Sequence, residues 1–398
     1  MSYTKMKTNR TKFLILAIAV LGSILVAPSI AAGPNCTAAD GNYIVTFAKE
    51  INSKSEMKSA PGKSINPKFE YANVLNGFAA TLSAEQVCAF QKRPNIESIE
   101  LDGDVTTSGA ITQTMTNDLN VWGLDRIDER SRPMDSLYAS SNDGTGATVY
   151  IVDSGVNNIS SEFGSRYSIN GFNTVPNTLS FADGNGHGTH VAVTAAGTNY
   201  GVAKNANVVS VRVLDSSGFG SWSGVVAGLD WIAGSANTNL KTKAVVNMSL
   251  GGKKNVAVDT AVNNIISKGF TVVVAAGNER ADACRTSPGG VIAAITVAAS
   301  DIGDVFASFS NKGACVDIIA PGVNIRSYWL NSVAVASGTS MASPHVAGVA
   351  AIYLGATAGT TPSSVWNAIN AASSLGKVTS VPPKTFNKLL CIVGCTKA

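Results

Sequence analysis

Thr148-Val-Tyr-Ile-Val-Asp-Ser-Gly155 is the stretch of this 398-residue chain that decides the fold. Five β-branched or aromatic residues in a row are typical of a strand buried on both faces, and the run ends at an acid followed by turn formers. Similar runs occupy residues 208–213, 244–248 and 270–274, with helix-like stretches at 222–235 and 256–268. This alternation predicts an α/β fold: a mostly parallel sheet with helices on both faces, whose functional groups gather at the carboxyl ends of the strands.

Composition and charge exclude several classes of protein. Apolar residues make up 45% and charged residues 14% of the chain, which is typical of a folded protein and not of a disordered one. Four of the 30 Lys and Arg residues lie in residues 1–31, which contain no acid, and the other 26 balance the 26 Asp and Glu residues. The rest of the chain therefore has no net field that would attract nucleic acid or an anionic membrane.

Residues 1–31 are expected to be a secretory signal peptide. Four bases precede an apolar run at residues 13–27, and Ser29 and Ala31 fit the −3 and −1 positions of a cleavage site. The alternative, a membrane anchor, needs about 20 apolar residues, more than this run contains. We therefore expect a secreted, extracellular protein that has no membrane contact once the signal is removed.

The rest of the chain divides into two parts, residues 32–114 and residues 115–398. In the first part, strand-like runs lie at 43–47, 69–82 and 96–101. Ser83 and Gln86 have the spacing of a capping box, so a helix is expected to start there. A small α+β unit is therefore predicted, followed at residues 105–120 by a polar stretch without periodicity that is typical of a linker.

Only three histidines can serve as a near-neutral general base. Two of them, His187 and His190, lie in Gly184-Asn-Gly-His-Gly-Thr-His-Val-Ala192, and His345 lies in Ser337-Gly-Thr-Ser-Met-Ala-Ser-Pro-His-Val-Ala-Gly348. An alternative for the first pair is an H-x-x-H zinc site, but no acidic third ligand stands nearby in a recognisable motif.

Three further side chains complete a catalytic set. Asp153 ends the first strand and Asn278 closes the fourth, while Ser340 stands where a helix over residues 341–354 should begin. Singly, each has a structural explanation, as a turn former, a loop residue at positive φ or a helix cap. Together with His187 they supply an orienting acid, a base, a nucleophile and an oxyanion donor.

The order Asp…His…Ser along the chain is that of the subtilisin triad. The motifs around these residues, together with Asn247-Met-Ser-Leu-Gly-Gly252, resemble the subtilases over residues 122–390, specifically the proteinase K and aqualysin branch. Residues 43–104 resemble the inhibitory propeptide of that family. The resemblance implies a subtilisin-like domain after a ferredoxin-like propeptide, and a monomeric serine endopeptidase made as a self-processing zymogen with no catalytic cofactor.

The resemblance also implies roles for the three histidines, and the chain departs from the family pattern at one residue. His187 becomes the base, and His190 and His345 become structural. Val193 replaces the glycine that the family usually has, so we expect the helix that carries His187 to be displaced. Two alternatives stay open: a catalytically silent relative that binds or scaffolds, and a serine esterase.

By this resemblance, two short segments of the chain form the edges of a substrate-binding cleft. A third segment forms the first specificity pocket. An extended polypeptide can bind between such edges as an added strand, and small pocket residues imply broad specificity for apolar or aromatic residues. The propeptide should fill the same cleft and be cut between Ile111 and Asn117. The binding residues are Gly218, Phe219 and Gly220; Ser249, Leu250 and Gly251; and Ala275 and Gly277.

Six cysteines fall along the chain as three separated pairs, and export makes disulfides possible. The absence of any C-x-x-C, and of histidines near the pairs, argues against zinc. The resemblance matches Cys284 and Cys315 to a cross-link. Cys36–Cys88 would tie the propeptide, and Cys391–Cys395 would close a loop so short that geometry could forbid it.

The resemblance also implies structural calcium. Asp125, Asp128, Glu129 and Asp135 crowd into eleven residues, and calcium prefers oxygen ligands of this kind. A solvated acidic surface neutralised by Arg126, Arg130 and Arg132 is the alternative. A second site is expected at Asp317, with the backbone carbonyls of Ile292 and Ala294.

Overall fold

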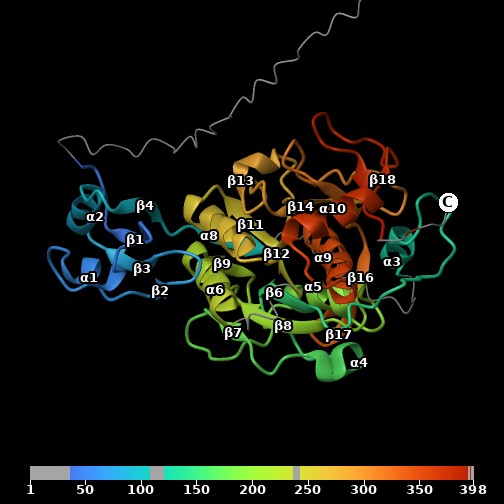
Figure 1. The fold of residues 1–398 in the computed structure, drawn as a ribbon, viewed down its shortest axis with the longest axis horizontal. Coiled ribbons are helices and arrows are strands. Elements are labelled where there is room, and N and C mark those ends of the chain that lie inside the picture. Colours follow the sequence, from blue (N-terminus) through green and yellow to red (C-terminus); the bar gives the residue numbers. More distant parts are fainter. Residues whose placement is uncertain (1–35, 108–120, 236–242, 393–394, 396–398) are drawn as a thin grey trace, which may run out of the picture.

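The computed structural model describes residues 36–107, 121–235, 243–392 and 395, and it contains a small and a large unit (Figure 1). The expected signal peptide with Ser29 and Ala31, and the expected cut between Ile111 and Asn117, lie outside the described residues. Among the helices that are described, none is both long and apolar enough to cross a membrane.

A nine-stranded sheet forms the centre of the large unit. Its strands are parallel except for the antiparallel pair β18 and β19 at one edge, so the predicted mostly parallel sheet is confirmed. Along the sheet the order is β18 (Ser374–Leu375), β19 (Lys388–Leu389), β15 (Ile318–Pro321), β14 (Ile295–Ser300), β12 (Thr271–Ala275), β10 (Ala244–Met248), β6 (Thr148–Asp153), β8 (Asn207–Arg212) and β7 (Phe172–Asn173).

Helices cover both faces of this sheet because successive side chains of a strand point to opposite sides. Val149 and Ile151 of β6 join the core that contains α5, α9 and α10, whereas Tyr150 and Val152 join the core that contains α6 and α8. The helices are α3 (Trp122–Ile127), α4 (Ser160–Phe163), α5 (His187–Ala196), α6 (Trp222–Ser235), α8 (Val256–Ser267), α9 (Thr339–Ala356) and α10 (Pro362–Ala372), with 3₁₀ turns at Gly164–Arg166 and Ala283–Arg285.

The small unit is the predicted α+β fold, an antiparallel sheet with two helices on one face. Phe47, Phe78 and Phe90 pack together between the sheet and the helices, with ring centroids about 6 Å apart. Ser83 caps the second helix, and both bonds of the predicted capping box with Gln86 are present. The elements are β1 (Gly41–Phe47), α1 (Ser53–Lys58), β2 (Phe69–Tyr71), β3 (Gly77–Leu82), α2 (Ala84–Gln91) and β4 (Ile96–Leu101).

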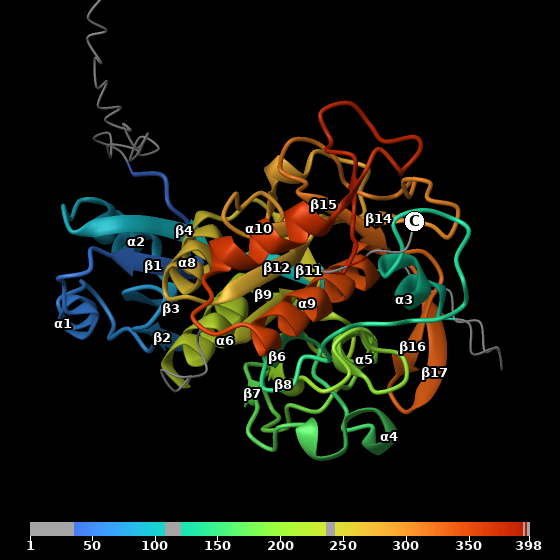
Figure 2. The same cartoon turned by 45° about the vertical axis from the view of Figure 1, so that its right-hand side comes forward.

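The other face of the small sheet lies on α6 and α8 of the large unit (Figures 1 and 2). Asp230 of α6 accepts hydrogen bonds from the backbone N–H groups of residues 72, 73 and 74, at 3.1, 2.6 and 2.8 Å. Two acids of the small unit bind helix starts: Asp102 accepts from Ser223 N of α6, and Glu100 accepts from Val256 N of α8, each at 2.8 Å. Negative side chains are favourable there because helix amino ends carry partial positive charge.

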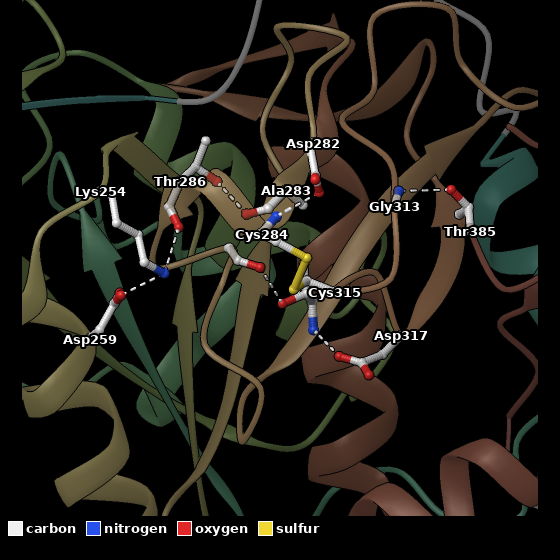
Figure 3. The surroundings of a disulfide bond; sticks show 12 residues. Lys254, Asp259, Asp282, Ala283, Cys284, Thr286, Gly313, Cys315, Asp317 and Thr385 are labelled. Carbon is white, nitrogen blue, oxygen red and sulfur yellow. Dashed lines mark hydrogen bonds and ion pairs between the residues drawn. A yellow bond between two sulfur atoms is a disulfide. The ribbon is translucent and has the colours of Figure 1, made fainter. Parts of the chain in front are cut away.

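All three expected disulfides are present, and no described cysteine is free. Figure 3 shows Cys284–Cys315, which joins the loop after β12 to the segment before β15, with Cα atoms 5.3 Å apart. The short loop of Cys391–Cys395 also closes, because its Cα atoms lie 6.1 Å apart and within the usual range for a disulfide.

Candidate active site

An acid and an imidazole meet at the carboxyl end of β6. Asp153 is the last residue of β6 and His187 is the first residue of α5, and both side chains are almost fully buried. Asp153 Oδ1 lies 2.8 Å from His187 Nδ1 and also accepts a bond from Ser154 N at 2.7 Å. A buried carboxylate bonded to Nδ1 fixes the imidazole tautomer that leaves Nε2 able to take a proton.

Gly188 and Asp183 explain why α5 can begin so close to β6. A Cβ atom on Gly188 would lie 2.1 Å from Gly155 O, so a side chain there would push the helix away. Asp183 accepts bonds from the N–H groups of Asn185, Gly186 and Thr189 at 2.8–2.9 Å, and so satisfies the amino end of α5. Asp183 was not predicted from the sequence, although an acid shortly before a helix start is a known capping signal.

Ser340 lies in the first turn of α9, as expected, and is fully buried. Its Oγ donates a hydrogen bond to Ser249 O, at the carboxyl end of β10, at 3.0 Å. Because α9 packs against α5, and β10 pairs with β6, Ser340 joins Asp153 and His187 at one edge of the sheet. His187 Nε2 is buried and has no hydrogen-bond partner within the described part of the chain.

Asn278 follows β12, the next strand along the same edge. Its Oδ1 accepts hydrogen bonds from Thr339 N at 2.9 Å and from Thr339 Oγ1 at 3.0 Å. Thr339 N can only donate, so this contact assigns the amide oxygen and leaves Nδ2 as the donor on the opposite side of the group. Thr339 therefore orients the amide directly beside Ser340. The sequence analysis did not identify this role of Thr339.

His190 and His345 are buried, and each bonds a backbone carbonyl. Nε2 of His190 lies 3.0 Å from Ile325 O, and Nδ1 of His345 lies 2.8 Å from Met341 O. Burial lowers the pKa of His190 to about 3 and that of His345 to about 4, so both stay neutral near pH 7. Within the described residues, the one cluster able to hold a metal contains neither His187 nor His190, which disfavours the zinc alternative.

Val193 does not displace the start of α5 and the His187 imidazole as we expected. It is fully buried in the core, and the 2.8 Å contact between His187 and Asp153 is intact. The close approach of α5 and α9 depends instead on Gly348, where a Cβ atom would lie 2.7 Å from Ala195 O. A side chain at residue 193 is therefore compatible with the packing of these two helices.

Beside these residues lies a cleft occupied by the end of the small unit. Strand β5 (Asp104–Thr107) runs antiparallel between β9 (Phe219–Ser221) and β11 (Leu250–Lys253), and β13 (Thr286–Ser287) extends the sheet beyond β11. Thr106 lies opposite Phe219 on one side and Gly251 on the other, and Thr107 N donates to Gly218 O at 3.1 Å. These are the two edges that the sequence analysis selected for substrate binding.

A cavity of about 350 Å³ opens beside β5 and β11. Its lining includes Ala275 and Gly277, which we assigned to the specificity pocket, and Gly251 of the substrate-binding edge. The sequence analysis missed its charged lining, which comes from Lys253, Glu279, Asp282 and Arg285.

Three of the four expected calcium ligands come together. Oxygen atoms of Asp125, Glu129 and Asp135 lie within 4.8 Å of one another. Asp125 Oδ1 and Glu129 Oε2 are buried and have no hydrogen-bond partner in the described residues, which fits a site for a cation. Burial, together with the neighbouring carboxylates, raises the pKa of both groups. Asp128 is not part of this cluster and accepts a bond from Ala139 N instead.

Two of the three nearby arginines bind groups outside the carboxylate cluster. Arg126 forms a buried ion pair with Asp304 at 2.7 Å, and it also donates to the backbone oxygen of Glu129 at 2.6 Å. Arg130 donates to the backbone oxygens of Cys395 and Ala372. Neither Asp125 nor Glu129 forms an ion pair with an arginine among the described ion pairs.

The second expected calcium site is a cavity of about 290 Å³ lined by Ile292, Ala294 and Asp317. Asp317, labelled in Figure 3, accepts a bond from Thr296 N at 2.8 Å, and burial raises its pKa to about 6. A half-buried carboxylate beside two backbone segments is a donor set that calcium accepts.

The acid, imidazole, hydroxyl and oriented amide form the set that a serine hydrolase uses. Comparison with known proteins also indicates a serine hydrolase. The profile of the subtilase family matches residues 144–388, and that of the peptidase inhibitor I9 family matches residues 42–108. The chain belongs to the subtilase family of serine proteases.

Individual relatives cover most of the chain. Alkaline serine exoprotease A of Vibrio alginolyticus is 45% identical over 328 residues, which is 82% of this chain but 60% of that protein. The extracellular serine proteinase of Thermus sp. (strain Rt41A) is 45% identical over 302 residues, 75% of this chain and 71% of the relative. The solved structure of a cold adapted subtilisin-like serine proteinase, 48% identical, superposes with a TM-score of 0.66 over 69% of this chain and 98% of that one.

Proposed function

We propose that the chain is a secreted serine endopeptidase made as a self-processing zymogen. Its parts would be a signal peptide at residues 1–31, an inhibitory propeptide at 32–114 and a catalytic domain at 115–398. The observation that carries this proposal is β5, a strand of the small unit bound between two edges of the large unit beside Ser340. A polypeptide bound in this way presents its backbone to the catalytic groups with little demand on sequence.

The reaction would be hydrolysis of a peptide bond through an acyl-enzyme. Ser340 Oγ attacks the carbonyl carbon, its proton passes to His187 Nε2, and Asp153 holds the resulting imidazolium. Ser340 Oγ donates to Ser249 O in this structure, so the side chain first turns toward His187. The tetrahedral oxyanion is stabilised by the Asn278 amide and the Ser340 N–H. His187 then gives its proton to the leaving amine, and a water molecule releases the acyl group.

Substrate specificity should be broad. Gly218, Phe219 and Gly220 on one edge, with Ser249, Leu250 and Gly251 on the other, bind the substrate mainly through its backbone. The cavity at Ala275 and Gly277 accepts apolar or aromatic side chains, and its mixed charges do not select one sign.

The zymogen would process itself in the segment that follows β5. Thr107, the last residue of β5, pairs with Leu250, which directly follows Ser249 in the chain. The carbonyl of Ser249 is the one that Ser340 Oγ contacts. The cut therefore follows the strand, and the window between Ile111 and Asn117 is our choice from the sequence. After the cut, the propeptide inhibits the enzyme as a bound product.

Calcium would stabilise the fold and take no part in the chemistry. Asp125, Glu129 and Asp135 would hold one ion, and Asp317 with the carbonyls of Ile292 and Ala294 a second. A bound ion stabilises the folded state alone, by about 2.7 kcal/mol at a hundredfold excess over Kd. The disulfides are consistent with export, since such bonds persist outside the cytoplasm.

The test is to purify the secreted enzyme and label it with a fluorophosphonate probe before assays on casein and on simple esters. Labelling of Ser340 with cleavage of casein supports the proposal. A protein that is not labelled would be a silent relative, and a labelled protein that cleaves only esters would be an esterase.

A further inference from the structure

The hairpin formed by β16 (Ile325–Trp329) and β17 (Ser332–Ala336) leads directly into the proposed nucleophile. Its strands pair from Ile325 with Ala336 to Trp329 with Ser332. Just beyond the paired strands, Gly338 N donates to Gly322 O at 2.8 Å. Ser340 follows Gly338 by two residues, so a shift of the hairpin would also shift the proposed nucleophile.

The same hairpin is fastened to α5, the helix that begins with His187 (Figure 2). His190 makes two of these contacts. Its Nε2 lies 3.0 Å from Ile325 O, and its backbone oxygen accepts a bond from Ser327 Oγ at 2.9 Å. The hairpin therefore links the element that carries the base to the element that carries the nucleophile.

Trp329, the last residue of β16, lies against the catalytic imidazole itself. The ring centroids of Trp329 and His187 are 6.1 Å apart with planes at 82°, and the indole is buried. The indole fits because residue 186 is glycine: a Cβ atom there would lie 2.1 Å from the indole Nε1. The backbone of Gly186 also has a φ of +112°, which glycine adopts without strain.

One hydrogen bond does not fix the plane of a histidine ring. The bond to Asp153 holds Nδ1, but the terminal torsion of histidine is broad, so the ring can still tilt and move Nε2. A perpendicular aromatic neighbour limits that tilt. Proton transfer in turn depends on geometry held to a fraction of an ångström.

We infer that Trp329 is a positioning residue for His187, which keeps Nε2 aimed at the hydroxyl of Ser340. This inference rests on the proposed function. It predicts an effect on the chemical step and not on substrate binding, because the ring contacts of Trp329 are with His187 and His190, whereas β9 and β11 form the cleft.

The test compares Trp329→Leu and Trp329→Phe in the processed enzyme with Tyr328→Leu as the matched control. Tyr328 belongs to the same hairpin but packs on Tyr200, with ring centroids 5.8 Å apart. The measurements are kcat and KM on a peptide substrate, the rate constant for fluorophosphonate labelling of Ser340, and Tm.

Trp329→Leu should lower kcat and the labelling rate constant at least tenfold with KM within twofold of wild type, and Trp329→Phe should restore most of the loss. Tyr328→Leu should lower Tm without lowering kcat per labelled site. Equal kcat per labelled site in Trp329→Leu and wild type would overturn the inference. If Trp329→Leu is not secreted, Trp329→His replaces it in the comparison with Trp329→Phe and wild type. A wild-type enzyme that is not labelled at all would instead overturn the proposed function.

Discussion

Thr107 N donates a hydrogen bond to Gly218 O at 3.1 Å, and this contact joins the last strand of the small unit to the cleft of the large one. On its other side Thr107 lies opposite Leu250, so the strand is held by both edges at the same residue. The inhibitory unit therefore occupies the cleft in the manner expected of a substrate, and it leads toward Ser340. In the proposed function, both inhibition and self-processing would depend on this single arrangement.

Replacement of Asn278 by alanine should lower kcat about 10²–10³-fold, a figure that comes from the corresponding experiment in subtilisin. KM should change little, because the amide stabilises charge that develops only in the transition state. Thr339→Ser is the control, since it keeps the hydroxyl that bonds Asn278 Oδ1. Steady-state kinetics on a peptide substrate provide the measurement, and a raised KM with an unchanged kcat would argue for a binding role instead.

Restoring glycine at residue 193 should destabilise the enzyme without activating it. Val193 is fully buried, so Val193→Gly leaves a cavity and adds a glycine to the middle of α5. The expected cost is about 2–4 kcal/mol in the free energy of unfolding, seen as a Tm lower by several degrees. A kcat that rises severalfold in Val193→Gly would show that valine does strain the site.

Removal of calcium should lower Tm by a few degrees and accelerate self-digestion, with the initial kcat preserved. Glu129→Gln should lose most of the calcium dependence at the first site, because Glu129 Oε2 is a buried oxygen without a hydrogen-bond partner in the described residues. Asp128→Asn is the matched control, since Asp128 lies outside the cluster. Melting curves with calcium and with excess chelator provide the measurement. Identical curves for wild type, together with no metal by elemental analysis, would rule out both sites.

The burial of Glu100 against α8 should contribute more stability to the zymogen under mildly acidic conditions than at neutral pH. Burial raises the pKa of Glu100 in the folded chain, and the bond from Val256 N only partly offsets this. A raised folded-state pKa contributes stability that is fully present below the unfolded value, about 4.5, and that is lost as pH rises through the folded value. Glu100→Gln in a Ser340→Ala background should remove this part of the pH dependence of Tm. An unchanged profile between pH 4 and pH 7 would contradict the assignment.

The sequence could predict the large sheet and the positions of the candidate catalytic residues for one physical reason. Buried parallel strands are short apolar runs, and the chemistry stands at their carboxyl ends, so Asp153 and Asn278 are marked by the runs that precede them. The positions of His187 and Ser340 followed from motifs at helix starts. Local sequence patterns therefore predicted the positions of most candidate site residues.

Contacts between distant segments could not be predicted in this way. Strand β5 lies in a polar stretch without periodicity, and its partners β9 and β11 are far away along the chain. The contact of Trp329 with His187 depends on a hairpin whose position no local pattern encodes. The effect of Val193 was misjudged because the glycine that matters for helix packing, Gly348, lies on the partner helix.

The most direct test of the account is the secretion of Ser340→Ala beside wild type, followed by intact-mass analysis and amino-terminal sequencing. Ser337→Ala is the matched control, because Ser337 lies three residues earlier and bonds only the loop residue Asn324 in the described contacts. Wild type and Ser337→Ala should appear as an enzyme that starts after β5, within or beside residues 111–117, and should cleave casein. Ser340→Ala should be folded, with propeptide and catalytic domain still joined, and inactive. Processing of Ser340→Ala at the same bond, with casein cleavage like that of wild type, would contradict the account.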